Sequence, residues 1–281
     1  MENVVLSVWI QHISSFEFVF YLRYSRSFFF HCNQMINHSL AISTFFPPYV
    51  NPLRLTIFQT SICSLIESGY DGYIFICDDG SSTYDHLDFI YSLHNDKIVV
   101  YKQGENRGYS KIKNLGIKLI LDQNNEFGFL CDDDLLYKKD WWTYYLDAYE
   151  KTGYPHYSFF NHTYGGQHDL GTLFEKNGID LRLTPLLQGG MLTFSSTLIN
   201  QVGYYKIFPR KLGHEHTNFT VRIIHKNIIP GFLDLRDSME YLSHVEESVR
   251  ISTVPNDYQE QIIENGVFVY TDLDRIEPCI F

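Results

Sequence analysis

Short apolar runs and helix-spaced apolar residues alternate along the chain from residue 39 onward. Residues 39–44 ("SLAIST"), 73–77 ("YIFIC"), 97–101 ("KIVVY") and 127–131 ("FGFLC") are such runs, the pattern of strands that are buried on both faces. The segments between them carry apolar residues at helical spacing. Strands that alternate with helices of this length predict successive βαβ units, and so an α/β fold with a mostly parallel central sheet flanked by helices.

The alternation becomes looser in the second half of the chain. Residues 154–187 are predicted to be a loop with short strands. Residues 189–205 are expected to form a strand that runs into a helix, and residues 213–227 a helix that is entered through a glycine. The last forty residues show no strong pattern.

The first 36 residues are rich in aromatic side chains but have no clean periodicity. They contain no uninterrupted apolar run of about 18 residues, so we expect no integral membrane span there. Met35 offers an alternative start, which makes residues 1–36 either a poorly packed extension or a segment that is not translated.

Two acidic turns follow predicted strands: "DDGSS" begins at Asp78, and "DDD" occupies residues 132–134. In parallel sheets ligands bind outside the carboxyl ends of the strands, so the two turns are expected at one site. Hard cations such as Mg²⁺ and Mn²⁺ take carboxylate oxygens together with the phosphates of a substrate. The alternatives are a tight βα turn for the first stretch and a surface turn or helix cap for the second.

Two further stretches carry candidate chemistry. The helix that begins near residue 110 has Lys111 and Lys113 in its first turns, which suits an anion, although solvated lysines on an amphipathic helix give the same pattern. Glu215, next to Gly213 at a helix start, is a candidate general base if burial raises its pKa. His214 and His216 are interpreted as polar neighbours and not as a metal site.

The composition narrows the classes of partner. A net charge of −11 disfavours a nucleic-acid partner, because such a surface must neutralise many phosphates. The five cysteines are widely spaced and form no C-x-x-C pair, which indicates a reducing, cytoplasmic location. Peripheral contact of the protein with a membrane surface remains an open alternative.

Taken in order, these stretches resemble the family 2 glycosyltransferases with the GT-A fold, over roughly residues 39–226. The stretches that carry the resemblance are "SLAISTFF", "FICDDGSS", "NRGYSKIKNLGIK", "FLCDDDLL", "GGMLTFSSTLINQVGYY" and "GHEHTNFTVRI". The resemblance implies a GT-A domain over residues 37–250, with a nucleotide-binding half at 37–135 and an acceptor half at 136–250. Residues 251–281 are left as a C-terminal segment.

The resemblance also implies roles for single residues. Glu215 is the expected catalytic base. Donor binding is expected from Thr44, Asp78, Asp79, Lys113, Asn114 and Asp132. Mn²⁺ or Mg²⁺ is expected at Asp133 and Asp134, with His244 as a weaker third ligand. The expected acceptor side comprises Gly189 and Gly190, together with Trp141 and Trp142. The two tryptophans follow the acidic turn and suit stacking on a sugar, although packing in the core is the expected use of at least one of them.

The implied activity is metal-dependent transfer of a sugar, with inversion, from a nucleotide-diphosphate donor to a hydroxyl. A UDP-sugar is the expected donor, and the acceptor is a glycan, a lipid or a protein. The chain departs from the family pattern at Cys131, where the acidic run usually begins, and at His216, where a second acid usually stands. These departures keep open the alternative that the chain is a catalytically silent protein that binds a sugar nucleotide or a glycan. Two other classes of enzyme fit less well. A nucleotidyltransferase would have a Gly-rich basic loop after the first strand, which this chain lacks. A phosphatase of the haloacid dehalogenase type would have threonine where Leu136 stands.

Overall fold

The computed structural model divides the chain into two compact units, Met1–Met35 and Ile36–Phe281. It describes residues 19–20, 28–29, 36–48, 51–163, 170–245 and 257–281. In the first unit β1 (Val19–Phe20) pairs antiparallel with β2 (Phe28–Phe29). The other predictions for residues 1–36 lie outside the described residues. The remaining strands and helices all belong to the second unit.

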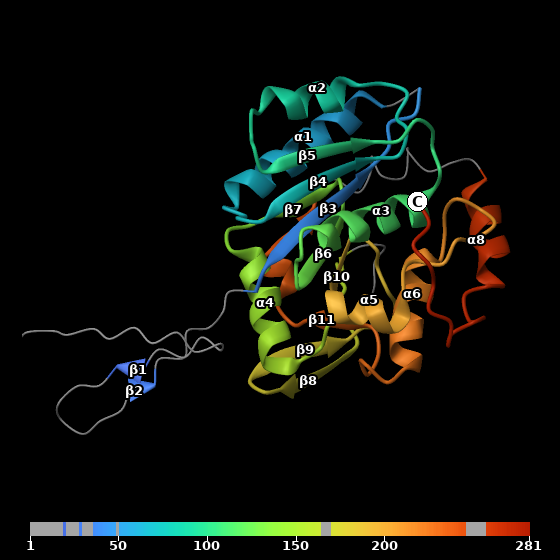
Figure 1. Cartoon of the computed structure of the whole chain (residues 1–281). Coiled ribbons are helices and arrows are strands. Elements are labelled where there is room, and N and C mark those ends of the chain that lie inside the picture. Colours follow the sequence, from blue (N-terminus) through green and yellow to red (C-terminus); the bar gives the residue numbers. More distant parts are fainter. Residues whose placement is uncertain (1–18, 21–27, 30–35, 49–50, 164–169, 246–256) are drawn as a thin grey trace, which may run out of the picture. The chain divides into compact units, whose positions relative to one another are not determined.

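A five-stranded sheet forms the centre of this unit, in the order β10-β6-β3-β4-β5 (Figure 1). Its parallel strands are β3 (His38–Thr44), β4 (Tyr73–Asp78), β5 (Ile98–Lys102) and β6 (Phe127–Asp132). The fifth strand, β10 (Met191–Ser195), runs antiparallel to β6. The predicted mostly parallel α/β sheet is therefore confirmed.

Helices cover both faces of the sheet (Figure 1). One hydrophobic core lies against α1 (Pro52–Glu67), α2 (Asp85–Ser92) and α4 (Trp141–Thr152), and a second core lies against α3 (Tyr109–Asp122), α5 (Ser196–Val202) and α6 (Glu215–His225). Successive residues of β3 point to opposite cores: Leu40 and Ile42 belong to the first, and Ala41 to the second. This is why a continuous apolar run is needed in a strand that is buried on both faces.

The register of the sheet brings polar residues to one edge. Thr44 is the register partner of Asp78 on β4, and Ser43 is the register partner of Asp132 on β6. The carboxyl ends of three parallel strands therefore meet at the same level, where ligands bind in sheets of this kind.

Smaller sheets complete the unit. The antiparallel strands β8 (Thr172–Lys176), β9 (Ile179–Leu183) and β11 (Leu233–Leu235) form a three-stranded sheet in the order β11-β9-β8. The acidic turn runs directly into β7 (Leu135–Tyr137), which pairs with β12 (Leu242–His244). The turn is therefore no helix cap, because the next helix, α4, begins only at Trp141.

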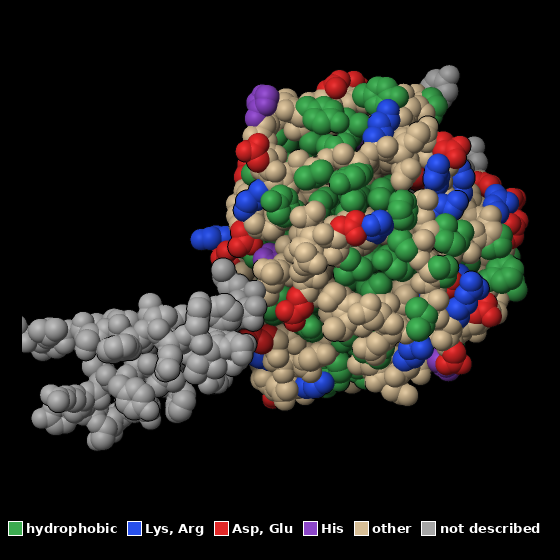
Figure 2. All heavy atoms as spheres, in the orientation of Figure 1, with side chains coloured by type: hydrophobic (Ala, Val, Ile, Leu, Met, Phe, Trp, Pro, Cys, Tyr) green, Lys and Arg blue, Asp and Glu red, His purple; other side chains and the backbone are tan. Residues whose placement is uncertain are grey.

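The C-terminal part forms α8 (Tyr258–Gly266), which packs on the same unit. Among the described residues no helix combines the length and the apolar character that crossing a membrane requires. On the face drawn in Figure 2, Lys and Arg side chains are scattered among Asp and Glu and form no continuous basic surface.

The acceptor role expected of the two tryptophans needs correction. Trp141 is fully buried and Trp142 is 6% exposed. The Trp141 ring stacks on Tyr70 and meets Phe129 edge-on, with ring centroids 5.8 and 4.8 Å apart. Neither indole has a face left for a sugar, because the inner side of α4 turns both into the core.

We predict that Trp141→Ala lowers the free energy of unfolding by about 3–5 kcal/mol, since it leaves a large cavity in a packed core. Tyr91→Ala, at a side chain that is 60% exposed, is the control and should change stability by less than about 0.5 kcal/mol. Urea unfolding of both variants measures this. Unchanged stability in Trp141→Ala would contradict the core assignment.

Candidate active site

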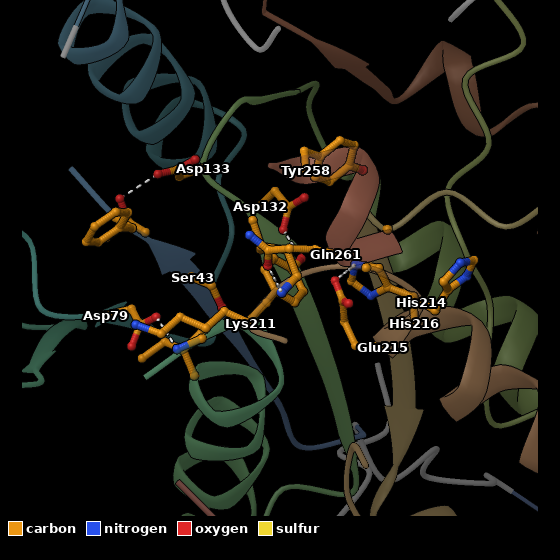
Figure 3. Close-up of a pocket in the computed structure, with 18 of the residues that line it drawn as sticks. Ser43, Asp79, Asp132, Asp133, Lys211, His214, Glu215, His216, Tyr258 and Gln261 are labelled. Atoms are coloured by element: carbon orange, nitrogen blue, oxygen red, sulfur yellow. Dashed lines mark hydrogen bonds and ion pairs between the residues drawn. The ribbon is translucent and has the colours of Figure 1, made fainter. Parts of the chain in front are cut away.

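A pocket of about 690 Å³ opens at the carboxyl edge of the sheet, and acidic residues from both turns line it (Figure 3). The turns after β3, β4 and β6 form one side of it. The start of α6 and the wall of α8 form the other. Asp132, Asp133 and Asp134 therefore share one cavity with Glu215.

The first aspartate of the triplet is paired with a buried lysine. The Lys113 ammonium donates to Asp132 Oδ1 over 3.0 Å and to the Cys131 carbonyl over 2.8 Å, and the Tyr109 hydroxyl donates to the same carboxylate oxygen. Lys113 is 1% exposed and does not line the pocket. The positive charge of Lys113 lies behind Asp132. It lowers the free-energy cost of an ionised carboxylate at the pocket wall.

The second aspartate is held from the first strand and the first helix. Asp133 Oδ2 accepts hydrogen bonds from the Thr44 hydroxyl and the Arg54 guanidinium. Arg54 lines the pocket and lies over the Phe46 ring, 4.9 Å from its centroid. Arg54 was not among the site residues predicted from the sequence. Its place in the first turn of α1, just past the end of β3, is the signal that could have revealed it.

Asp134 directly precedes the strand pair β7–β12, and this pair brings His244 close to the aspartate triplet. Asp134 lines the pocket, and its carbonyl accepts from the Val245 amide over 2.8 Å. His244 lies opposite Leu135 in the register of β12 and β7, with its Nδ1 3.1 Å from the Asn161 amide nitrogen. His244 is thus near the triplet in space, although it is not among the residues that line the pocket.

The residues present fit a divalent cation of the kind expected. Within the described ranges no group of three or more His, Cys, Asp or Glu is arranged to hold a metal by itself. Mg²⁺ and Mn²⁺ sites that act on nucleotides need no such cage, because one or two carboxylates and the substrate phosphates supply the ligands. Hard carboxylate oxygens from Asp133 and Asp134 at one pocket wall meet this requirement.

The turn after β4 separates its two aspartates. Asp78 is fully buried and does not line the pocket; its carboxylate accepts from the Ser81 amide over 3.1 Å and from the Ser81 hydroxyl, and lies 3.0 Å from His86 Nε2. Asp79 lines the pocket and accepts from two backbone amides at residues 107 and 108, each over 2.9 Å. Burial raises the pKa of Asp79 to about 6. The structure therefore has Asp78 shaping the turn and Asp79 facing the pocket.

Asn114 is also placed behind the pocket. It is fully buried, donates to the carbonyls of Tyr205 and Ile280, and accepts from the Tyr205 amide over 2.7 Å. These bonds tie α3 to the segment after α5 and to the end of the chain. Asn114 therefore supports the pocket wall and does not reach the cavity.

Glu215 is the first residue of α6 and is 6% exposed. Burial raises its pKa to about 7, and the negative charge of Asp132 adds to this rise, while backbone N–H groups oppose it. Figure 3 shows its side chain next to that of His216. The distance from Glu215 Oε1 to His216 Nε2 is 3.8 Å. A carboxyl that titrates near neutral pH inside a pocket has the property required of a general base.

The two predicted glycines lie where histidines approach the backbone. Gly189 lines the pocket, and a Cβ added there would lie 2.0 Å from His216 Nε2. A Cβ at Gly190 would lie 3.0 Å from His244 Nε2, and Gly190 does not line the pocket. The Tyr109 ring packs edge-on against His216, with ring centroids 4.8 Å apart. Glycine at 189 is thus what allows the His216 imidazole to lie at the pocket wall.

Comparison with known proteins identifies the family of the chain. The family model "Glycosyl transferase family 2" matches residues 54–212, so the chain belongs to glycosyltransferase family 2. An uncharacterized glycosyltransferase of Acanthamoeba polyphaga mimivirus is 29% identical over 203 residues, which are 72% of this chain and 79% of that relative. The expected class of enzyme, a glycosyltransferase, is confirmed.

Solved structures share the fold at low sequence identity. The mannosyltransferase PcManGT from Pyrobaculum calidifontis, in complex with GDP-Man and Mn²⁺, is 14% identical with a TM-score of 0.50, over 66% of this chain and 52% of that one. GalNAc-T7 with UDP, GalNAc and Mn²⁺ is 12% identical with a TM-score of 0.53, over 67% of this chain and 40% of that one. These likenesses confirm the GT-A fold. The chain spans about half or less of the length of these proteins.

We predict that Gly189→Ala destabilises the protein by about 1–3 kcal/mol, because the new methyl group must displace the His216 imidazole. Adding His216→Ala should remove most of this loss, since the shorter side chain leaves room for it. Gly104→Ala is the control, because nothing lies within 4 Å of a Cβ there. Urea unfolding of these three variants, and of His216→Ala alone as the reference for the double variant, measures the effect. Equal loss with and without His216 would refute the contact.

Proposed function

We propose that the protein transfers a sugar from a nucleoside-diphosphate donor to a hydroxyl group of a glycan, lipid or protein, with metal dependence and with inversion. The observation that carries this proposal is that the aspartate triplet and a buried glutamate of raised pKa line one pocket. The aspartates would provide ligands for a cation that binds a diphosphate, and the glutamate would provide a base for an acceptor hydroxyl.

The donor end of the pocket combines polar and cationic groups. Thr44 and Asp79 lie at the ends of neighbouring strands, where hydroxyl and base N–H groups of a nucleoside would find acceptors. Arg54 and Lys211 also line the pocket and supply positive charge for phosphates. We propose a UDP-sugar, although one of the two similar structures holds GDP-Man and the other holds UDP. A transfer assay that decides the donor therefore includes a GDP-sugar beside a UDP-sugar.

Asp133 and Asp134 are the residues that would hold Mn²⁺ or Mg²⁺. Both line the pocket, and both similar structures were solved with Mn²⁺. A divalent cation bound there supplies positive charge that offsets the negative charge growing on a departing diphosphate. Arg54, already paired with Asp133, is placed to add a second positive charge at the same wall.

Glu215 would remove the proton from the attacking hydroxyl. Its carboxylate lies in the same cavity, and burial keeps it a stronger base than an exposed glutamate. A hydroxyl that attacks the anomeric carbon opposite the diphosphate inverts that centre, and one base suffices for it. A silent binding protein has no need of a buried carboxyl with a raised pKa in its cavity, which is why we favour the enzyme.

We also propose a reducing, intracellular location. The four cysteines among the described residues, which are Cys63, Cys77, Cys131 and Cys279, are all free thiols. This fits a compartment in which disulfides do not form.

Glu215→Gln should lower the transfer rate by about 10²–10⁴-fold while UDP affinity stays within about twofold, because the lost interaction is one that the transition state needs. In the wild type, kcat should fall about tenfold per pH unit below pH 7, since protonated Glu215 accepts no proton. Initial rates across pH and calorimetry with UDP and Mn²⁺ measure both effects. A flat pH profile between 5 and 8, with full activity in the glutamine variant, would remove Glu215 from its role.

Asp133→Ala and Asp134→Ala should each abolish the Mn²⁺-dependent part of UDP affinity. Asp147→Ala, at an exposed carboxylate paired with Lys151, is the control and should bind as the wild type does. Titration of UDP with and without Mn²⁺ distinguishes the cases. If both pocket variants keep metal-dependent binding, the cation site lies elsewhere.

A further inference from the structure

The loop at residues 210–214 leads directly into Glu215, and side chains of α8 hold its backbone. Asn265 is fully buried and lies against this loop. Its amide nitrogen donates to the carbonyls of Leu212 over 2.7 Å, and of Gly213 and Arg210 over 3.2 Å each. Its amide oxygen accepts from the Arg210 amide over 3.1 Å. One side chain thus contacts four backbone polar groups, with its two N–H hydrogens shared among the three carbonyls. Buried backbone groups need such partners.

Other α8 contacts strengthen this attachment. Gln261 accepts from the Leu212 amide over 3.1 Å and donates to Asp257 over 2.9 Å. The Arg210 guanidinium bonds Asp257 at the start of the helix, and lies 3.3 Å from Glu264 further along it. The loop is therefore bound to α8 by both its backbone and its side chains.

The loop holds a backbone shape that needs such support. Gly213 has φ of +102° and His214 has φ of 66°, two left-handed residues in succession immediately before Glu215. Ile262 on α8 fills the space beside Gly213, where an added Cβ would lie 3.1 Å from its Cγ1. Sparsely populated backbone states of this kind persist only where the surrounding structure fixes them, and they cluster at active sites.

A second attachment reaches the helix that begins with Glu215. The side-chain amide of Asn218 donates from Nδ2 to the carbonyl of Val269, just after α8, over 2.8 Å. Tyr258, Gln261 and Ile262 also line the pocket, so α8 is at once a wall of the cavity and a support for its base (Figure 3). The family match ends at residue 212, so this support lies outside it.

We infer that α8 fixes Glu215 in its working position, and that Asn265 is the positioning residue through which it acts. The inference rests on the proposed function, since Glu215 matters here as the base for an acceptor hydroxyl. Asn265 touches no reacting atom. Its effect passes through the loop backbone, where a displacement of about 1 Å can cost a hundredfold in rate.

The test compares Asn265→Ala with wild type and with Ile263→Ala, a change on the solvent side of the same helix at a residue that is 71% exposed. We expect kcat to fall at least tenfold in Asn265→Ala, while the UDP dissociation constant stays within about twofold. Ile263→Ala should match wild type in both. Loss of UDP affinity in step with kcat would show general unfolding and overturn the inference.

A double-mutant cycle separates positioning from a merely structural role. Residues that act as one unit are not additive, so Asn265→Ala should slow transfer less than twofold in a Glu215→Gln background. A full tenfold loss in that background would contradict the inference. If Asn265→Ala does not fold, Gln261→Met removes one bond of the same loop and should lower kcat in the same direction.

Hydrogen exchange keeps this inference distinguishable from the proposed function. Peptides that cover residues 210–218 should exchange faster in Asn265→Ala than in wild type, whether or not sugar is transferred. A wild type that transfers no sugar from UDP- or GDP-sugars refutes the proposed function, and the positioning role falls with it. Unchanged exchange beside normal transfer refutes the positioning role alone.

Discussion

The structure depends on keeping several carboxylates close together at one edge of a sheet. Like charges a few ångströms apart repel strongly where water is scarce. Three of these acids have a partner from another element: Lys113 of α3 for Asp132, Arg54 of α1 for Asp133, and backbone amides before α3 for Asp79. The parallel register that aligns the strand ends makes these pairings possible.

The surroundings of Glu215 differ from those of the aspartates, and they determine how this carboxyl titrates. Within the described residues no lysine or arginine lies within ion-pair distance of it, and burial raises its pKa from 4.5 to about 7. The folded state therefore binds a proton more tightly than the unfolded state. From this group alone, stability falls as pH rises from about 4.5 to 7, and stays lower above that range. The same ionisation makes Glu215 a base, so function and stability oppose each other here.

Local pattern predicted a mostly parallel sheet, the succession of strands and helices along the chain, and the acidic edge, because periodicity and caps are properties of neighbouring residues. It could not place side chains that depend on distant partners. The burial of Trp141 depends on the side of α4 that meets the sheet. Asp78 and Asp79 are adjacent yet face opposite ways, and only the folded turn decides which one meets the pocket. For Arg54 the sequence offers only its place in the first turn of α1, and α8 reaches the site through tertiary contacts that carry no local signal.

The most direct test is a crystal structure of the protein with UDP and Mn²⁺, with the cation located by its anomalous scattering. We predict manganese bound by carboxylates of the triplet, with the diphosphate beside Arg54 and Glu215 facing the open end of the cavity. Manganese and UDP bound elsewhere, or UDP in the pocket with no cation at the triplet, would contradict the proposed site.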